Sequence, residues 1–175
     1  YRGIALAEMI KVNFNVKFLL QKKSISSPIT EAGYNIEYIP QNIALQDEPD
    51  FFEKTISNNT IIVLDGYEFN ESYQNKIKGK EYKLVFIDDL AIGTQKADLV
   101  INHSPGIRAN EYQKEKYTTL ALGMNFALLR KSFINYDRGK RKLKNDCSNV
   151  LVSFGGADPK NFTHKTVIEL LKSTK

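Results

Sequence analysis

The sequence has little cysteine and histidine and no long apolar run in its 175 residues. Its single cysteine, Cys147, excludes an internal disulfide and a zinc site built from cysteines, and it fits a reducing cytoplasm. No uninterrupted apolar stretch approaches the roughly 18 residues that a membrane-spanning helix needs. Hydrophobic residues make up 42% of the chain and charged residues 26%. We therefore expect a globular, cytoplasmic protein without a membrane span.

An excess of basic residues gives the chain a net charge of +5, but this excess is local. Seven basic residues and one acidic residue lie between Arg130 and Lys144, which leaves 18 basic against 19 acidic residues elsewhere. A short basic run of this kind is typical of a solvated linker, and it has no interleaved aromatic residues on which bases could stack. We expect no nucleic-acid partner.

Apolar runs of strand length alternate with amphipathic stretches of helix length, which predicts an α/β fold with a parallel, Rossmann-like sheet. The chain opens in a helical pattern, "YRGIALAEMIKV", and shows no internal repeat. Further helices are predicted at 48–57 and 70–79, the second beginning after a capping asparagine, Asn70. The predicted strands are 15–21, 34–40, 60–66, 82–89, 97–103 and 117–123.

The pattern restarts near the end of the sequence with "NVLVSFGGADPKNFTHKTVIELL". Before it, the polar and basic segment 135–148 is the best candidate for an interdomain linker. We expect a first domain at 1–134 and the first βα unit of a second domain at 149–175. Because the opening helix has no capping residue before it, we also expect that the natural protein continues beyond this chain at both ends.

Polar residues follow several of the predicted strands. In open parallel sheets, ligands bind beyond the carboxyl ends of the strands. At these positions the chain carries Asp65 and Tyr67 in "DGYEF", Asp89 in "DDLA" and Asn102 in "NHSPG". Each also has a purely structural interpretation: a turn or helix cap for the aspartates, packing for the tyrosine and a turn for the asparagine.

The glycine turn in "SFGGADPKNFT" predicts a phosphate site. Glycines after a buried strand let the backbone approach an anion, and the helix that follows offers free N–H groups. Ser153, Gly155, Gly156 and Asn161 are the candidate phosphate-binding residues. The turn matches neither the dinucleotide fingerprint nor the P-loop, which disfavours a nicotinamide dehydrogenase or an NTP-driven enzyme. A plain turn is the alternative.

Five ordered motifs, "LDGYEF", "KLVFIDDLA", "ADLVIN", "LALGMNFALLRKSF" and "VLVSFGGADPKNFT", resemble those of a known family. This is the UDP-2,4-diacetamido-2,4,6-trideoxy-β-L-altropyranose hydrolase family of the pseudaminic acid pathway, which is similar to MurG-type glycosyltransferases with two facing Rossmann-like domains (GT-B). The resemblance implies hydrolysis at the anomeric carbon, giving UDP and free sugar for surface polysaccharide biosynthesis. It implies neither a metal nor a cofactor.

The resemblance also assigns roles to residues. Tyr67 matches the active-site tyrosine and is the expected catalytic residue, whereas Arg2, Asp65, Asp89 and Asn102 are expected to bind substrate. Arg2 matches the arginine of a Gly-x-Gly-His-x-x-Arg motif, whose catalytic histidine falls three residues earlier and outside this chain. The isolated 175-residue chain is therefore expected to be inactive.

Neither of the two histidines present matches that motif. His103 follows a predicted strand and faces the presumed cleft, where a surface histidine is favoured over a catalytic base, and His164 is expected to face solvent. Two other functions stay open at this point: a GT-B glycosyltransferase that passes the sugar to an acceptor, and a non-catalytic module that binds a nucleotide sugar.

Overall fold

The computed structural model describes residues 1–22, 24–136, 139, 149–155 and 158–173. The chain divides into two compact units, Tyr1–Tyr136 and Asp137–Lys175. Most of the predicted linker 135–148, Cys147 included, lies outside the described residues. Each unit is considered by itself below.

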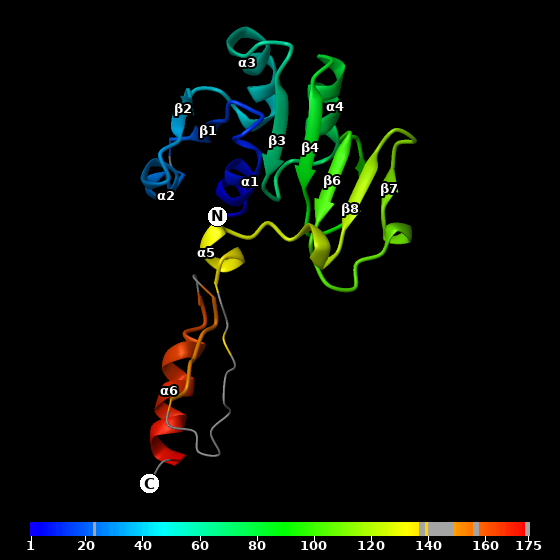
Figure 1. The fold of residues 1–175 in the computed structure, drawn as a ribbon. Coiled ribbons are helices and arrows are strands. Elements are labelled where there is room, and N and C mark those ends of the chain that lie inside the picture. The colour runs from blue at the N-terminus through cyan, green and yellow to red at the C-terminus, as the bar shows by residue number, and fades with distance from the viewer. Residues whose placement is uncertain (23, 137–138, 140–148, 156–157, 174–175) are drawn as a thin grey trace. The chain divides into compact units, whose positions relative to one another are not determined.

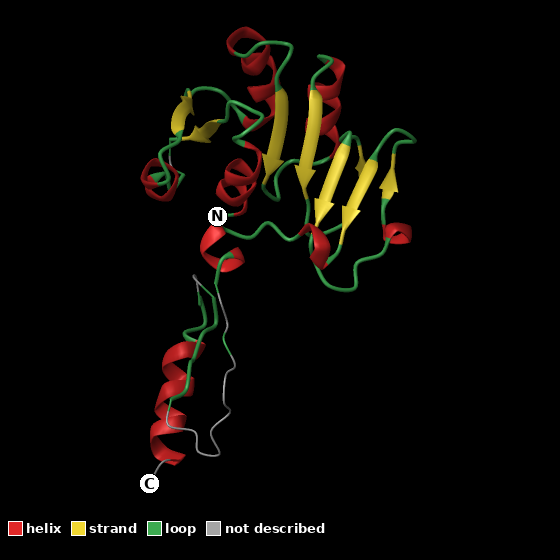
Figure 2. Ribbon diagram, viewed as in Figure 1, coloured by secondary structure: helices red, strands yellow, loops and turns green. Residues whose placement is uncertain are grey.

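A four-stranded parallel sheet forms the centre of the first unit (Figures 1 and 2). Its strands are β3 (Ile61–Asp65), β4 (Lys83–Ile87), β6 (Leu99–Asn102) and β8 (Thr119–Leu122), in the order β3-β4-β6-β8. Neighbouring strands pair in parallel throughout. The four arrows in Figure 1 point the same way, so the carboxyl ends of the strands share one edge. The expected α/β, Rossmann-like fold class is thereby confirmed.

Two small parallel sheets accompany the central one. Strands β1 (Lys17–Gln21) and β2 (Asn35–Ile39) form the first, and β5 (Thr94–Gln95) and β7 (Gln113–Lys114) form the second. Every predicted strand of the first unit is present, each slightly shorter than its predicted range. The two-residue strands β5 and β7 were not predicted, because two residues carry too little alternation to stand out.

The first unit contains the three predicted helices and two short ones that were not predicted. The predicted helices are α1 (Arg2–Ile10), α3 (Glu48–Thr55) and α4 (Glu71–Gly79), and the short ones are α2 (Ser27–Glu31) and α5 (Lys131–Ile134). Short 3₁₀ helices span Leu45–Asp47, Ala109–Glu111 and Met124–Phe126. Helix α4 begins where predicted, since the Asn70 side chain accepts a hydrogen bond from the Tyr73 amide at 3.1 Å. This cap satisfies one of the amides that a helix start leaves unpaired.

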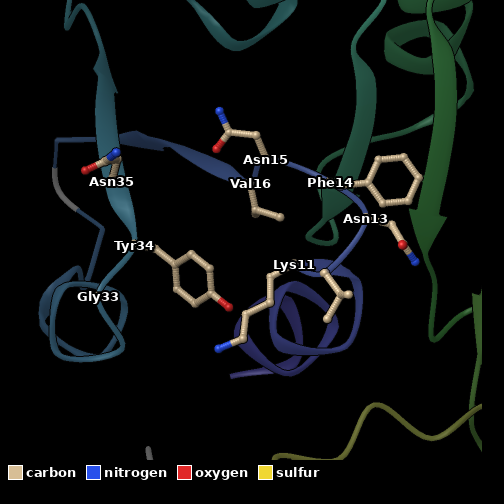
Figure 3. A pocket seen from close by; sticks show the side chains of 9 residues that line it. Lys11, Asn13, Phe14, Asn15, Val16, Gly33, Tyr34 and Asn35 are labelled. Atoms are coloured by element: carbon tan, nitrogen blue, oxygen red, sulfur yellow. The ribbon is translucent and has the colours of Figure 1, made fainter.

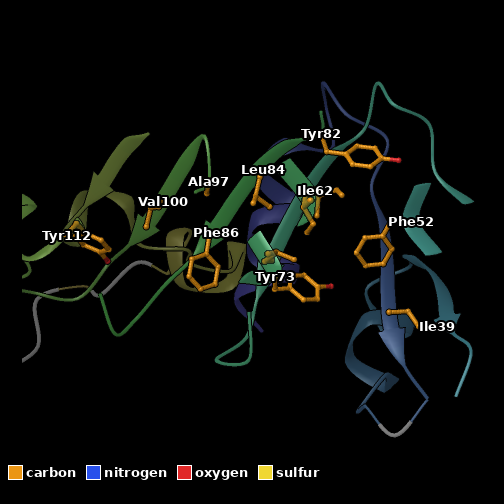
Figure 4. Close-up of a cluster of buried hydrophobic side chains, with 12 residues drawn as sticks. Ile39, Phe52, Ile62, Tyr73, Tyr82, Leu84, Phe86, Ala97, Val100 and Tyr112 are labelled. Carbon is orange, nitrogen blue, oxygen red and sulfur yellow. The ribbon is translucent and has the colours of Figure 1, made fainter. Parts of the chain in front are cut away.

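The main core lies between the central sheet and helices α3 and α4 (Figure 4). Ile77 of α4, Leu84 of β4 and Val100 of β6 are completely buried. Burying an aliphatic side chain of this size contributes about 1.5–3 kcal/mol. Packing on this face therefore fixes the strands relative to one another, and it holds their carboxyl ends side by side.

In the second unit, helix α6 (Phe162–Ser173) forms as predicted, but the strand predicted at 149–154 does not. That prediction was wrong for the described residues, because a strand needs a hydrogen-bonded neighbour and no strand partner is present in the described part of this unit. Gly155 has a φ of +80°, consistent with a turn before the helix.

No helix in the described ranges is long and apolar enough to cross a membrane.

Candidate functional site at the carboxyl edge of the sheet

Several of the predicted site residues meet at the carboxyl edge of the central sheet. Asp65 is the last residue of β3, Asp89 follows β4 after one intervening residue, and Asn102 is the last residue of β6. Arg2 is the first residue of α1, and the first turn of that helix lies against the end of β3. Because β3, β4 and β6 are consecutive neighbours, their ends lie along one edge of the sheet, and the start of α1 brings Arg2 to the same edge.

A single guanidinium joins two of the strand ends. Arg2 Nη1 donates to Asp89 Oδ1 at 2.5 Å, and Nη2 donates to Asp65 Oδ1 at 2.6 Å. All three side chains are about one quarter to one third exposed. Arginine suits this position because its rigid fork of donors binds two acceptors at once, which the single ammonium of lysine does less well. We call these three residues the carboxylate bridge.

The electrostatics of Asp89 show which other groups lie near it. Burial acts to raise the pKa of Asp89, but the hydrogen bond and charge of Arg2 outweigh burial and lower it. The nearby side chains of Tyr67 and His103 lower the pKa of Asp89 further. Asp89 is therefore held as a carboxylate at neutral pH, with Tyr67 and His103 beside it.

Tyr67 lies on the rim of this cluster, in the turn after β3. Its side chain is largely exposed, at 72%. The preceding residue, Gly66, sits in a crowded place: a Cβ there would lie 2.9 Å from both Glu68 Oε2 and a Phe69 ring carbon. Because glycine has no side chain, Gly66 permits the tight turn that leaves Tyr67 exposed at the edge of the sheet. The structure places Tyr67 near Asp89, at the rim of the carboxylate bridge.

Asn102 is placed differently from the others, because its side chain is completely buried. Its Nδ2 donates to the Tyr112 hydroxyl at 2.9 Å, and its Oδ1 accepts from the Ser104 amide at 2.9 Å. Tyr112 in turn donates to Asp88 Oδ2 at 2.7 Å. These bonds favour a structural role for Asn102, as a residue that shapes the loop after β6.

Asp88 completes this buried network. Its carboxylate accepts hydrogen bonds from the amides of Leu90 and Ala91 at 3.1 and 2.8 Å. Ala91 has a φ of +52°, an unusual conformation for a residue with a side chain, so the bonds to Asp88 help to hold this loop in place. The two neighbouring aspartates therefore have different roles. Asp88 holds the loop after β4, whereas Asp89 binds Arg2 at the edge of the sheet.

The predicted phosphate residues belong to the second unit. Gly156 lies outside the described residues, whereas Ser153, Gly155 and Asn161 are exposed. Asp158 caps helix α6, since its two carboxylate oxygens accept from the amides of Phe162 and Thr163 at 2.8 and 2.9 Å. Two of the amides that a phosphate would use are thus occupied by a carboxylate, and phosphate binding there stays a prediction.

His103 also lies near the carboxylate bridge, although the sequence favoured a surface histidine at this strand exit. It follows Asn102 directly, is partly buried and has its Nδ1 fully buried. Its position one residue beyond β6 was the available signal, because that position faces the same edge as Asp65 and Asp89. Across the described ranges, no group of three or more His, Cys, Asp or Glu side chains is arranged to hold a metal ion.

A separate cavity of about 550 Å³ lies between the end of α1 and the start of β1 and β2 (Figure 3). Lys11, Phe14, Tyr34 and Asn35 are among its lining residues, and none of the predicted site residues lines it. It is wide open to solvent and lies at the amino ends of the strands. The carboxyl edge is the better candidate site, because the charged and titratable side chains converge there.

No family model matches the chain. A protein of Methanocaldococcus jannaschii that is described only as uncharacterized is 28% identical to it over 186 residues. The similarity covers 100% of this chain and 37% of the archaeal protein, so the chain spans little more than a third of that relative. The activity of the whole protein is therefore a matter of proposal.

Proposed function

We propose that the protein hydrolyses a UDP-linked diacetamido-trideoxy sugar at the anomeric carbon, and that the carboxyl edge of the first unit binds the sugar. The observation that carries this proposal is the meeting of Tyr67 with the carboxylate bridge, Arg2, Asp65 and Asp89. The resemblance to the hydrolase family selected these four residues from motifs that lie far apart in the sequence. The strand order places Asp65 and Asp89 at one edge of the sheet, and Arg2 binds both of them there.

The chemistry fits such an edge. Water forms a bond to the anomeric carbon, the bond from that carbon to the diphosphate oxygen breaks, and a proton leaves the water. UDP is an acidic leaving group, so the demanding tasks are orienting the water and removing its proton. The Tyr67 hydroxyl orients water or sugar, and Asp89 fixes that hydroxyl. The resemblance assigns the proton acceptor to a histidine ahead of Arg2.

Within this proposal Arg2 positions other residues. Its two outer nitrogens are bound to Asp65 and Asp89, so it sets the spacing of two carboxylates that accept hydrogen bonds from sugar hydroxyl or acetamido N–H groups. The reaction is proposed to take place in the cytoplasm and to supply surface polysaccharide biosynthesis with the free sugar.

The assay follows the UDP-sugar with the natural full-length protein by proton NMR. Release of UDP and free sugar without any acceptor supports hydrolysis. Consumption of the UDP-sugar only when an acceptor sugar is added would replace the proposal with a glycosyltransferase. Binding without turnover under both conditions would indicate a non-catalytic module.

A further inference from the structure

His103 lies at the end of strand β6, and the proposed function gives this residue no role. It lies one residue beyond β6, and β6 pairs directly with β4, whose end carries Asp89. His103 is among the groups that act electrostatically on Asp89, so the imidazole and the carboxylate lie near each other. His103 therefore extends the cluster of Tyr67 and the carboxylate bridge by one strand.

The two ring nitrogens of His103 have different surroundings. Nδ1 is buried and has no hydrogen-bond partner in the described part of the chain. Nε2 makes no hydrogen bond within the described residues either, but it is not buried. This nitrogen is therefore accessible to solvent. Buried polar side-chain atoms are nearly always paired, which makes this arrangement unusual for a histidine with a purely structural role.

This difference favours one position of the proton on the neutral ring. A proton on Nδ1 would be a buried donor without an acceptor, whereas an unprotonated Nδ1 is a buried acceptor without a donor, which proteins tolerate more often. The neutral imidazole therefore carries its proton on Nε2, and His103 presents an N–H donor at the accessible side of the ring.

The charges around the donor select the ligand chemistry. Asp65 and Asp89 carry two negative charges against the single positive charge of Arg2. A diphosphate would be repelled by this excess, whereas neutral hydroxyl and acetamido groups would find carboxylate acceptors beside an imidazole donor.

We propose that His103 is a sugar-binding residue, whose Nε2–H donates to a hydroxyl or acetamido oxygen of the sugar beside Asp89. The inference rests on the proposed function for the identity of the ligand, a UDP-sugar. It adds a contact that is absent from the motifs that suggested this function.

The test compares two changes at one position. His103→Ala removes the donor, whereas His103→Gln keeps an N–H donor of similar reach.

Calorimetry with the natural full-length protein measures the affinities for the UDP-sugar and for UDP alone. We expect His103→Ala to weaken UDP-sugar binding about tenfold, the loss of one hydrogen bond, and to leave UDP binding unchanged. His103→Gln should recover at least half of the loss. His164→Gln, on the exposed face of α6, is the matched control and should bind as the wild type does.

Equal affinity of the wild type and His103→Ala for the UDP-sugar would overturn the inference, and so would equal losses for UDP and UDP-sugar, which indicate a structural defect. Failure of the proposed function is a separate result: the wild type would release no free sugar, while the loss of sugar affinity in His103→Ala would still support the contact.

Nitrogen-15 NMR of the imidazoles gives an independent readout that needs no ligand. The His103 signals are identified by their disappearance in His103→Gln. A neutral ring protonated on Nε2 supports the assignment of the donor, and a ring protonated on Nδ1 contradicts it.

Discussion

At the scale of single residues, the carboxylate bridge shows how a distant arginine makes a polar edge possible. Arg2 is 63 residues from Asp65 and 87 residues from Asp89 in the sequence. Two carboxylates at adjacent strand ends would repel each other without a shared cation. The sequence indicated all three residues as candidates, but it gave no sign that they bind one another, because that pairing depends on where α1 begins relative to the sheet.

Tyr67→Phe tests the role of the hydroxyl in the natural full-length protein. We expect kcat for the UDP-sugar to fall about 10- to 100-fold, within the range for loss of a positioned polar group. The affinity for UDP should stay within about twofold, since the nucleotide is expected to bind the second domain. Steady-state kinetics and UDP inhibition measure both quantities. Unchanged turnover would remove Tyr67 from the catalytic residues.

Asp89 predicts a change in acid stability. Because its pKa in the folded protein lies below the ordinary value of 3.8, the bridge stabilises the fold fully above about pH 4. This contribution is lost as the pH falls below that value and through the folded pKa. Asp89→Asn should therefore flatten the decline in stability below about pH 4, measured as the free energy of urea unfolding. Glu31→Gln, an exposed change on α2, should retain the wild-type decline; a steep decline in Asp89→Asn as well would refute the prediction.

At the scale of elements, the sequence predicted those strands and helices that carry their own pattern. The β3 residues Ile62 and Leu64 alternate with exposed neighbours, and "NESYQNKIKG" has both a cap and a helical stripe. The segment at 149–154 has an equally apolar pattern, yet it is not a strand, because pairing is a property of two segments. The local sequence pattern therefore predicts a strand correctly only where another segment of the fold pairs with it.

The cap of α4 should contribute measurably to stability. Asn70→Ala removes the acceptor for the Tyr73 amide and is expected to lower the free energy of unfolding by about 1 kcal/mol. Asn70→Asp, which keeps an acceptor at this position, should restore most of that loss. Chemical denaturation of the three proteins provides the comparison, and an Asn70→Ala protein as stable as the wild type would count against the cap.

Helices α3 and α4 are joined by a buried polar contact. Glu48, only 3% exposed, accepts hydrogen bonds from the Tyr73 hydroxyl at 2.8 Å and from Gln21 Nε2 at 2.9 Å. Burial and Glu48 raise the pKa of Tyr73, so this hydroxyl stays protonated and keeps donating.

Tyr73→Phe leaves the Glu48 carboxylate with one donor fewer in a buried place. We expect a loss of about 1–3 kcal/mol in the free energy of unfolding. Tyr38→Phe is the matched control, since Tyr38 is 45% exposed and its hydroxyl has no bond within the residues described. Thermal unfolding should separate the two variants; similar melting temperatures would show that the contact adds nothing.

At the scale of the whole molecule, sequence reasoning predicted the fold class and four residues that meet at one edge: Arg2, Asp65, Tyr67 and Asp89. It placed His103 at a strand exit beside the presumed cleft but interpreted it as a surface residue, because a single histidine in a loop has no pattern that indicates burial of one ring nitrogen. It also treated Asn102 as a ligand-binding residue, although its amide is engaged by Tyr112 and Ser104. The surroundings of His103 and of Asn102 depend on contacts between segments that are distant in the sequence, and only the folded structure shows these contacts.

In the proposed reaction, water attacks the anomeric carbon of a UDP-sugar bound at this edge. Reaction of the natural full-length protein in ¹⁸O-labelled water, followed by mass spectrometry of the nucleotide product, shows which bond breaks. Cleavage between carbon and oxygen leaves the phosphate oxygens untouched, so we expect unlabelled UDP together with free sugar. Labelled UDP, labelled UMP with a sugar phosphate, or no nucleotide release at all would contradict it.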